Sequence, residues 1–298
     1  MGLAHLGEVA ALGTAICWTI TGLSFEAAGR RIGSVSVNLI RLVMALALLC
    51  AFGALTRGRA LPTDASGQAW LWLGLSGLIG FSLGDLCLFR AYVLVGSRIA
   101  TLMMALVPPM VALIGRSFLH ETLGARDWIG MTITVAGVAW VVLERSPGAN
   151  GSHGDKRVQG VLLAFAGAVG QAVGLVMSKK GMGDYNAFAS TQIRIIAGLI
   201  GFIVIYFIIG WWRRAYAALA DRGAMARTAL GATFGPFMGV SLSLVAVQNT
   251  KAGVAATIMA IVPVLIIAPA VLLFHERVTP RAVGGACLAV AGVALLFM

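Results

Sequence analysis

The chain has 298 residues, of which 59% are hydrophobic and 11% are charged, and its mean hydropathy is +0.94. This composition excludes a soluble domain and predicts a polytopic membrane protein. The formal net charge of +11 does not indicate nucleic-acid binding, because most Lys and Arg residues lie in short spacers between apolar runs, where they can contact phospholipid head groups.

Apolar runs of about 20 residues recur along the chain, and each is long enough to cross roughly 30 Å of hydrocarbon as a helix. They fall near 7–28, 34–56, 69–95, 97–119, 124–143, 158–178, 187–210, 226–249, 251–274 and 279–297. We therefore predict an all-α membrane protein with ten transmembrane helices around a central cavity. Residues 1–143 and 158–298 form two five-helix repeats, and the loop at 144–157 joins them. The first run is expected to be a transmembrane helix rather than a cleaved signal peptide.

The two halves are related by an internal repeat. Residues 105–142 reappear without a gap 155 positions later, which superposes Pro108 on Pro263, Glu121 on Glu276 and Gly130 on Gly285. Earlier in the halves the offset is 153, and it pairs Arg41 with Arg194. Because each repeat has five spans, the second must start on the opposite side of the membrane. Inverted repeats of this kind are typical of secondary transporters, which bind substrate near the midplane between the halves.

Charged residues inside the predicted helices are the strongest functional signal, because a charge at the bilayer centre costs about 2.5–3.5 kcal/mol. Asp85 is the only acidic residue deep in a predicted span. Its role is either proton coupling or neutralisation of a buried arginine. Arg90 is poorly placed on the same helix to pair with it, so Arg41 and Arg194 are other possible partners. Alternatively, these two arginines lie near helix ends and extend their side chains to the membrane surface.

The substrate is expected at the midplane, in a mainly apolar cavity. The predicted lining residues project from helices expected at the centre, and they are Trp18, Tyr92, Met104, Gln171 and Met259. Apolar walls with a few polar groups are common in ligand sites, and methionine adapts to different ligand shapes. The alternative is that all five side chains only pack helix against helix. The helices at 124–143 and 279–297 carry few polar groups and are expected at the periphery.

Pro108 and Pro263 remove intrahelical hydrogen bonds and are candidate hinges for moving gates, although rigid membrane helices are also kinked by proline. The His-Glu pair at 120–121 and its copy at 275–276 lie in tight turns, where a structural role is favoured over chemistry. The four cysteines lie in apolar runs without metal-binding spacing, so neither a metal nor a disulfide is expected. No phosphate-binding GxxxxGK[ST] motif is present, and we expect no cofactor.

The repeated Pro and Glu thirteen residues apart, followed by a Gly-rich closing helix, resemble the drug/metabolite transporter (DMT) superfamily, EamA type, and within it the YddG-type amino-acid exporters. The resemblance covers nearly the whole chain. It implies ATP-independent export of amino acids, aromatic and other apolar ones, or of related metabolites, by alternating access. It also implies a bacterial inner-membrane location with both termini cytoplasmic.

Several alternatives stay open at this point. A multidrug or other metabolite exporter of the same fold is the main one. A channel should show rings of charge, and a membrane-embedded enzyme should show a polar catalytic cluster, so both are less favoured. The loops after odd-numbered helices hold eleven basic residues and those after even-numbered helices hold seven, which weakly favours the opposite orientation. The expected partners are a small-molecule substrate and the lipid bilayer, and a monomer is compatible with the sequence.

Overall fold

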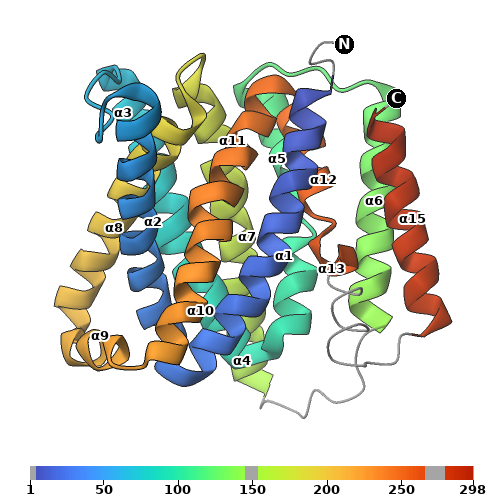
Figure 1. Cartoon of the computed structure of the whole chain (residues 1–298). Helices are drawn as coiled ribbons and strands as arrows, with labels where there is room; N and C mark the ends of the chain where they lie inside the picture. The colour runs from blue at the N-terminus through green and yellow to red at the C-terminus, as the bar shows by residue number, and fades with distance from the viewer. Residues whose placement is uncertain (1–4, 145–153, 266–278, 298) are drawn as a thin grey trace.

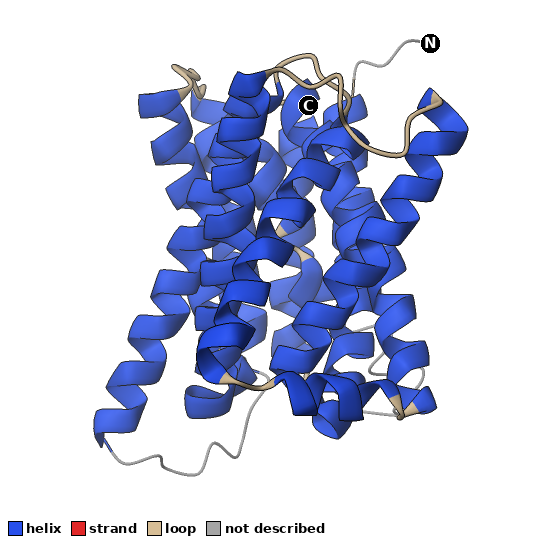
Figure 2. Ribbon diagram, turned by 90° about the vertical axis from the view of Figure 1, so that its left-hand side faces the viewer, coloured by secondary structure: helices blue, strands red, loops and turns tan. Residues whose placement is uncertain are grey.

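The computed structural model describes residues 5–144, 154–265 and 279–297, and every regular element in these ranges is helical. The helices lie side by side in one bundle (Figure 1), and most of them run along its long direction (Figure 2). Within the described ranges, six stretches are long and apolar enough to cross a membrane, and Val283–Phe297 is a shorter apolar helix. The bundle is therefore built mainly from membrane-spanning helices.

The first half of the chain contains α1 (Leu6–Ile32), α2 (Ser34–Arg57), α3 (Gly67–Gly77), the π-helix η1 (Leu78–Gly84), α4 (Asp85–Met104), α5 (Val107–Phe118) and α6 (Ala125–Glu144). The corner between α1 and α2 is a single residue, Gly33, whose φ of 83° suits glycine because it has no Cβ. The start of α3 is capped by Ser66, whose hydroxyl accepts a hydrogen bond from the backbone N–H of Ala69.

The second half contains α7 (Gly154–Met182), α8 (Ala187–Ile209), α9 (Trp212–Leu219), α10 (Arg222–Ala232), the π-helix η2 (Thr233–Gly239), α11 (Val240–Asn249), α12 (Ala252–Met259), α13 (Val262–Leu265) and α15 (Pro280–Phe297). The short helix α9 is not predicted from the sequence. It buries Ala215 and Ala218 and exposes Arg213 and Arg214, so it is an amphipathic surface helix too short to register as an apolar run.

One predicted helix boundary is wrong. We expect separate spans at 69–95 and 97–119, but helical residues run without a gap from Gly67 to Met104. Gly and Ser at 96–97 lower helix propensity without stopping a helix. The gap falls instead at Ala105 and Leu106, one residue before prolines 108 and 109, which have no N–H to bond the carbonyls of the preceding turn.

The same irregularities occur at equivalent positions of the two halves. The π-helices η1 and η2 are 155 residues apart, and so are the gaps at 105–106 and 260–261. The backbone N–H of Leu106 bonds Met103 O at 3.0 Å, and that of Ile261 bonds Ile258 O at 3.3 Å. The repeat seen in the sequence therefore extends to the backbone. Single π-helical turns often occur at functional sites.

The first helices of the two halves, α1 and α7, run in opposite directions. Near the start of α1, Glu8 accepts a hydrogen bond of 2.8 Å from the Thr250 hydroxyl. Near the end of α7, the Lys179 ammonium donates to the Thr250 carbonyl oxygen at 2.6 Å. Each of these helices packs on the π-helix of the other half. Thr14 on α1 donates to Gly239 O in η2, whereas Gly167 on α7 lies against the backbone of Gly84 in η1.

Helices α6 and α15 form a pair at one edge of the bundle in Figure 1. Their backbones approach closely because the facing residues are small. A Cβ on Gly137 would lie 2.4 Å from the Ala289 nitrogen, and one on Gly292 would lie 2.6 Å from the Thr134 nitrogen. Small residues let helix backbones approach in lipid, where apolar burial gives little driving force.

Candidate functional site

A buried ion pair lies where η1 ends and α4 begins. Asp85 is the first residue of α4, and its Oδ2 pairs with Nη2 of Arg41 on α2. The other carboxylate oxygen, Oδ1, accepts a hydrogen bond of 2.9 Å from Nε2 of Gln171 on α7. Asp85 is 6% exposed and Arg41 is 8% exposed. Both oxygens of this carboxylate are therefore occupied by protein donors inside the bundle.

The second buried guanidinium, Arg194 on α8, lies close to this pair. Its Cζ is 5.0 Å from the centroid of the Phe81 ring in η1, a cation–π contact. Its Nη2 lies so near Gly80 that an added Cβ there would be 3.5 Å away. Arg194 also interacts electrostatically with Asp85. The residue is only 5% exposed, so its charge is held in the protein interior.

These four side chains form a cluster that draws on both halves of the chain, and we name Arg41, Asp85, Gln171 and Arg194 the buried polar cluster. Asp85 pairs with Arg41, one of the partners that the sequence suggested, while Arg90 is exposed. The alternative that the two arginines extend to the membrane surface is wrong for this structure, because both are less than a tenth exposed.

Comparison with known protein families gives one match that covers both halves of the chain. The EamA-like transporter family matches residues 5–143 and again residues 158–298. The chain belongs to the EamA-like transporter family. It is therefore a multi-pass membrane protein of a transporter family, which places the buried polar cluster inside a transporter.

Two further similarities concern individual proteins. A relative from Sinorhizobium sp, named "Uncharacterized transporter in cobO 3'region", is 32% identical over 128 residues, a stretch that covers 40% of this chain and 90% of the relative. A solved structure described as "Crystal structure of protein" has a TM-score of 0.75 and 18% identity. The likeness covers 97% of this chain and 95% of that chain. At this identity it shows a shared fold alone.

In this EamA-like transporter, the five residues predicted to line a cavity have different surroundings. Gln171 is engaged with Asp85. Trp18 packs against the core cluster that contains the buried Met259, and its ring touches Gly239 in η2. Met104 packs against a separate cluster on α4 and α7. The Tyr92 side chain lies outside the described part of the structure. A shared binding cavity for these residues stays a prediction.

The predicted hinges lie at the interruptions of the helices. Pro108 is buried in the first turn of α5, just after the gap that ends α4. The backbone of Pro263 lies in α13, just after the matching gap, and its side chain is outside the described atoms. Proline fits a first helical turn because its missing N–H has no intrahelical partner there. The hinge role itself stays a prediction.

The end of the bundle that carries Thr250 is tied together by charged groups. Glu121 follows a residue with φ of 55°, as expected for the predicted turn, and its Oε1 pairs with Lys179 at 2.5 Å. Its Oε2 accepts a hydrogen bond of 2.9 Å from the backbone N–H of Ala252. Lys251 pairs with Asp127 at 2.5 Å. These contacts join α5, α6, α7 and α12, and sequence spacing alone does not reveal them. The copy of the turn, at 275–276, lies outside the described residues.

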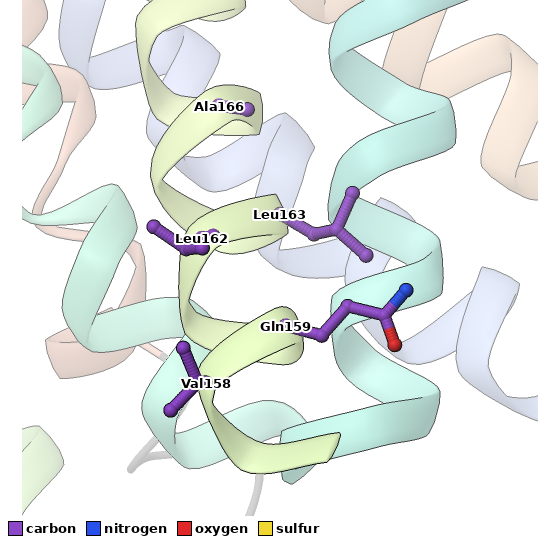
Figure 3. A pocket seen from close by; sticks show the side chains of 5 residues that line it. All are labelled: Val158, Gln159, Leu162, Leu163 and Ala166. Atoms are coloured by element: carbon purple, nitrogen blue, oxygen red, sulfur yellow. The ribbon is translucent and has the colours of Figure 1, made fainter. Parts of the chain in front are cut away.

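A surface depression of about 550 Å³ lies along α7 (Figure 3). Its lining residues all come from α7 and are Val158, Gln159, Leu162, Leu163 and Ala166. Three of these side chains are exposed apolar groups on the outer face of the helix. An apolar outer face in a membrane protein contacts lipid, so we assign no substrate role to this depression.

Proposed function

We propose that this chain is a secondary transporter that exports amino acids, aromatic and other apolar ones, or related small metabolites by alternating access. The buried polar cluster carries the proposal. It combines α2 and α4 of the first half with α7 and α8 of the second, next to a π-helical turn. Ionisable residues inside membrane helices commonly mark substrate or ion pathways, and transporters bind substrate between their repeats.

The proposed transport cycle uses the internal repeat. Two inverted five-helix repeats, at 1–143 and 158–298, rock about the centre, and the interruptions before Pro108 and Pro263 act as hinges. The antiparallel directions of α1 and α7 and the repeated backbone irregularities support this. The ion pair of Lys179 and Glu121 closes one end of the bundle. The proposed location is the bacterial inner membrane, with both termini cytoplasmic and a monomer as the working unit.

The proposed substrate-contacting residues are Trp18, Tyr92, Met104, Gln171 and Met259. For all five to contact one substrate, an open conformation must bring them around a shared binding cavity. Trp18 and Met259 already pack against one core cluster. Gln171 bonds Asp85, so a substrate that hydrogen-bonds this amide would change the contacts of the carboxylate. Binding and charge coupling are thereby linked through one side chain.

A competition assay tests the proposed substrate contacts. Reconstituted Trp18→Ala and Met259→Ala variants should change the relative uptake of large and small amino acids by about tenfold, because the truncations enlarge an apolar wall. Trp140→Ala is the matched control, since Trp140 is 47% exposed on the outer face of α6. This variant should rank the amino acids by uptake in the same order as the unmodified protein. An unchanged ranking in both well-folded variants would remove these residues from the site.

A further inference from the structure

The two repeats supply two arginines to the buried polar cluster but only one carboxylate. Arg41 and Arg194 are repeat equivalents at an offset of 153. Asp85 has Val240 at its equivalent position in the second half, at an offset of 155. Arg41 has Asp85 as its ion-pair partner. The repeat therefore leaves the position of Arg194 without the carboxylate that its counterpart has.

The side chain of Arg194 carries a buried donor that the described residues do not use. Its Nε is enclosed and has no hydrogen-bond partner among the described residues. Asp85 attracts it through space, but both oxygens of that carboxylate already accept from Arg41 and Gln171. One turn earlier on α8, Ser190 also has a fully buried hydroxyl without a hydrogen-bond partner in the described part of the chain. Arg194 and Ser190 thus present unused donors on one face of α8.

We propose that Arg194 binds the carboxylate group of the exported substrate, with Ser190 as an additional donor. This inference rests on the proposed transport of amino acids and names the chemical group that the site recognises. A guanidinium presents its donors in a planar fork that matches a carboxylate, and such paired hydrogen bonds are among the strongest in proteins. The one positive charge that Asp85 does not pair with matches one carboxylate group. The face of Phe81 holds the guanidinium in place and shields it from water.

The substrate carboxylate would therefore pair with Arg194 as the carboxylate of Asp85 pairs with Arg41. A bound amino acid would neutralise the second guanidinium within the bundle, and its departure would leave that charge uncompensated. A structural alternative is that Arg194 only balances Asp85 and packs on Phe81. The two readings differ in one respect, because only carboxylate recognition makes the binding of a ligand depend on its acid group.

Thermal stabilisation of the purified full chain separates these readings. The probes are L-phenylalanine, L-phenylalanine amide, 3-phenylpropanoate and acetate, each titrated into the unmodified protein and into Arg194→Gln. We expect the acid to bind at least about tenfold more tightly than the amide in the unmodified protein. This preference should disappear in Arg194→Gln and return in part in Arg194→Lys. Ser190→Ala should reduce it, while Arg31→Gln, which alters an exposed arginine, should leave it unchanged.

The outcomes distinguish this inference from the proposed function. Equal binding of acid and amide to the unmodified protein would overturn the role of Arg194, and so would an acid preference that survives in Arg194→Gln. If the amino acid does not bind but 3-phenylpropanoate or acetate stabilises only proteins that keep Arg194, the carboxylate site stands and amino-acid transport is wrong. If none of the four probes stabilises the protein, both are wrong. If Arg194→Gln does not fold, the Lys and Ser190→Ala variants decide between recognition and packing.

Discussion

Asp85→Asn is expected to abolish transport and to lower the free energy of unfolding by about 3–5 kcal/mol, the usual cost of removing one partner of a buried ion pair. The substitution leaves Arg41 inside the bundle without its carboxylate and removes the negative charge that attracts Arg194. It also places an amide opposite Gln171 where an acceptor carboxylate was. Uptake into proteoliposomes between about pH 5.5 and 8 and thermal unfolding in detergent measure the two effects.

A double variant separates charge from stability. Arg41→Gln combined with Asp85→Asn removes both charges, so it should recover much of the lost stability without recovering transport. Asp64→Asn is the control, because Asp64 pairs with Arg57 in an exposed position and its loss should change little. Normal expression of Asp85→Asn, with uptake at the unmodified rate over the whole pH range, would refute a role for this carboxylate.

Gly77→Ala should destabilise the protein by about 3 kcal/mol or more. A Cβ at this position would lie 2.1 Å from the carbonyl oxygen of Arg194 and 2.8 Å from its Cα, and backbone atoms cannot move aside as a flexible side chain can. The contact holds α8 against the end of α3, and this positions Arg194 beside η1. The loss should therefore appear in both the folded yield and the unfolding temperature.

The matched control is Gly67→Ala, at the start of the same helix, where an added Cβ meets open space. This variant should unfold within a few degrees of the unmodified protein. Equal stability of the Gly77 and Gly67 variants would mean that α3 and α8 do not approach as described.

The sequence predicts the general features of the buried polar cluster because charge in a membrane span is rare and costly. Asp85, Arg41 and Arg194 are identified by that rule alone, and Asp85 pairs with one of the two arginines named as possible partners. The role of Phe81 is not predictable in this way, since an aromatic residue in an apolar span gives no signal of its own. Gln171 is identified as polar, but its partner depends on how α7 packs against η1.

Backbone irregularities were less predictable than the helices that contain them. The glycines at 80 and 84 and their copies at 235 and 239 suggest close packing, and the structure shows π-helical turns at these places. Prolines indicate the interruption before Pro108, whereas the boundary expected near residue 96 rests only on the length of apolar runs. Hydropathy gives the number of residues available for spanning, but hydrogen bonding decides where a helix is broken.

The proposed cavity depends on tertiary arrangement more than any other prediction. Residues such as Met104 and Met259 are related by the repeat, yet in this structure they pack against different clusters. Repeat equivalence places two side chains at corresponding positions of two halves, and it does not bring them into contact. A common site requires the halves to move relative to one another, which is a property of the transport cycle.

Counterflow in proteoliposomes tests the central claim, that this EamA-like transporter works by alternating access. Vesicles containing the purified chain are loaded with unlabelled L-phenylalanine and diluted into a trace of the labelled amino acid. An alternating-access transporter should accumulate the label transiently above its equilibrium level, and the initial rate should saturate with substrate and fall in Asp85→Asn. Uptake that rises linearly with concentration, without a transient accumulation, would contradict alternating access and indicate a channel.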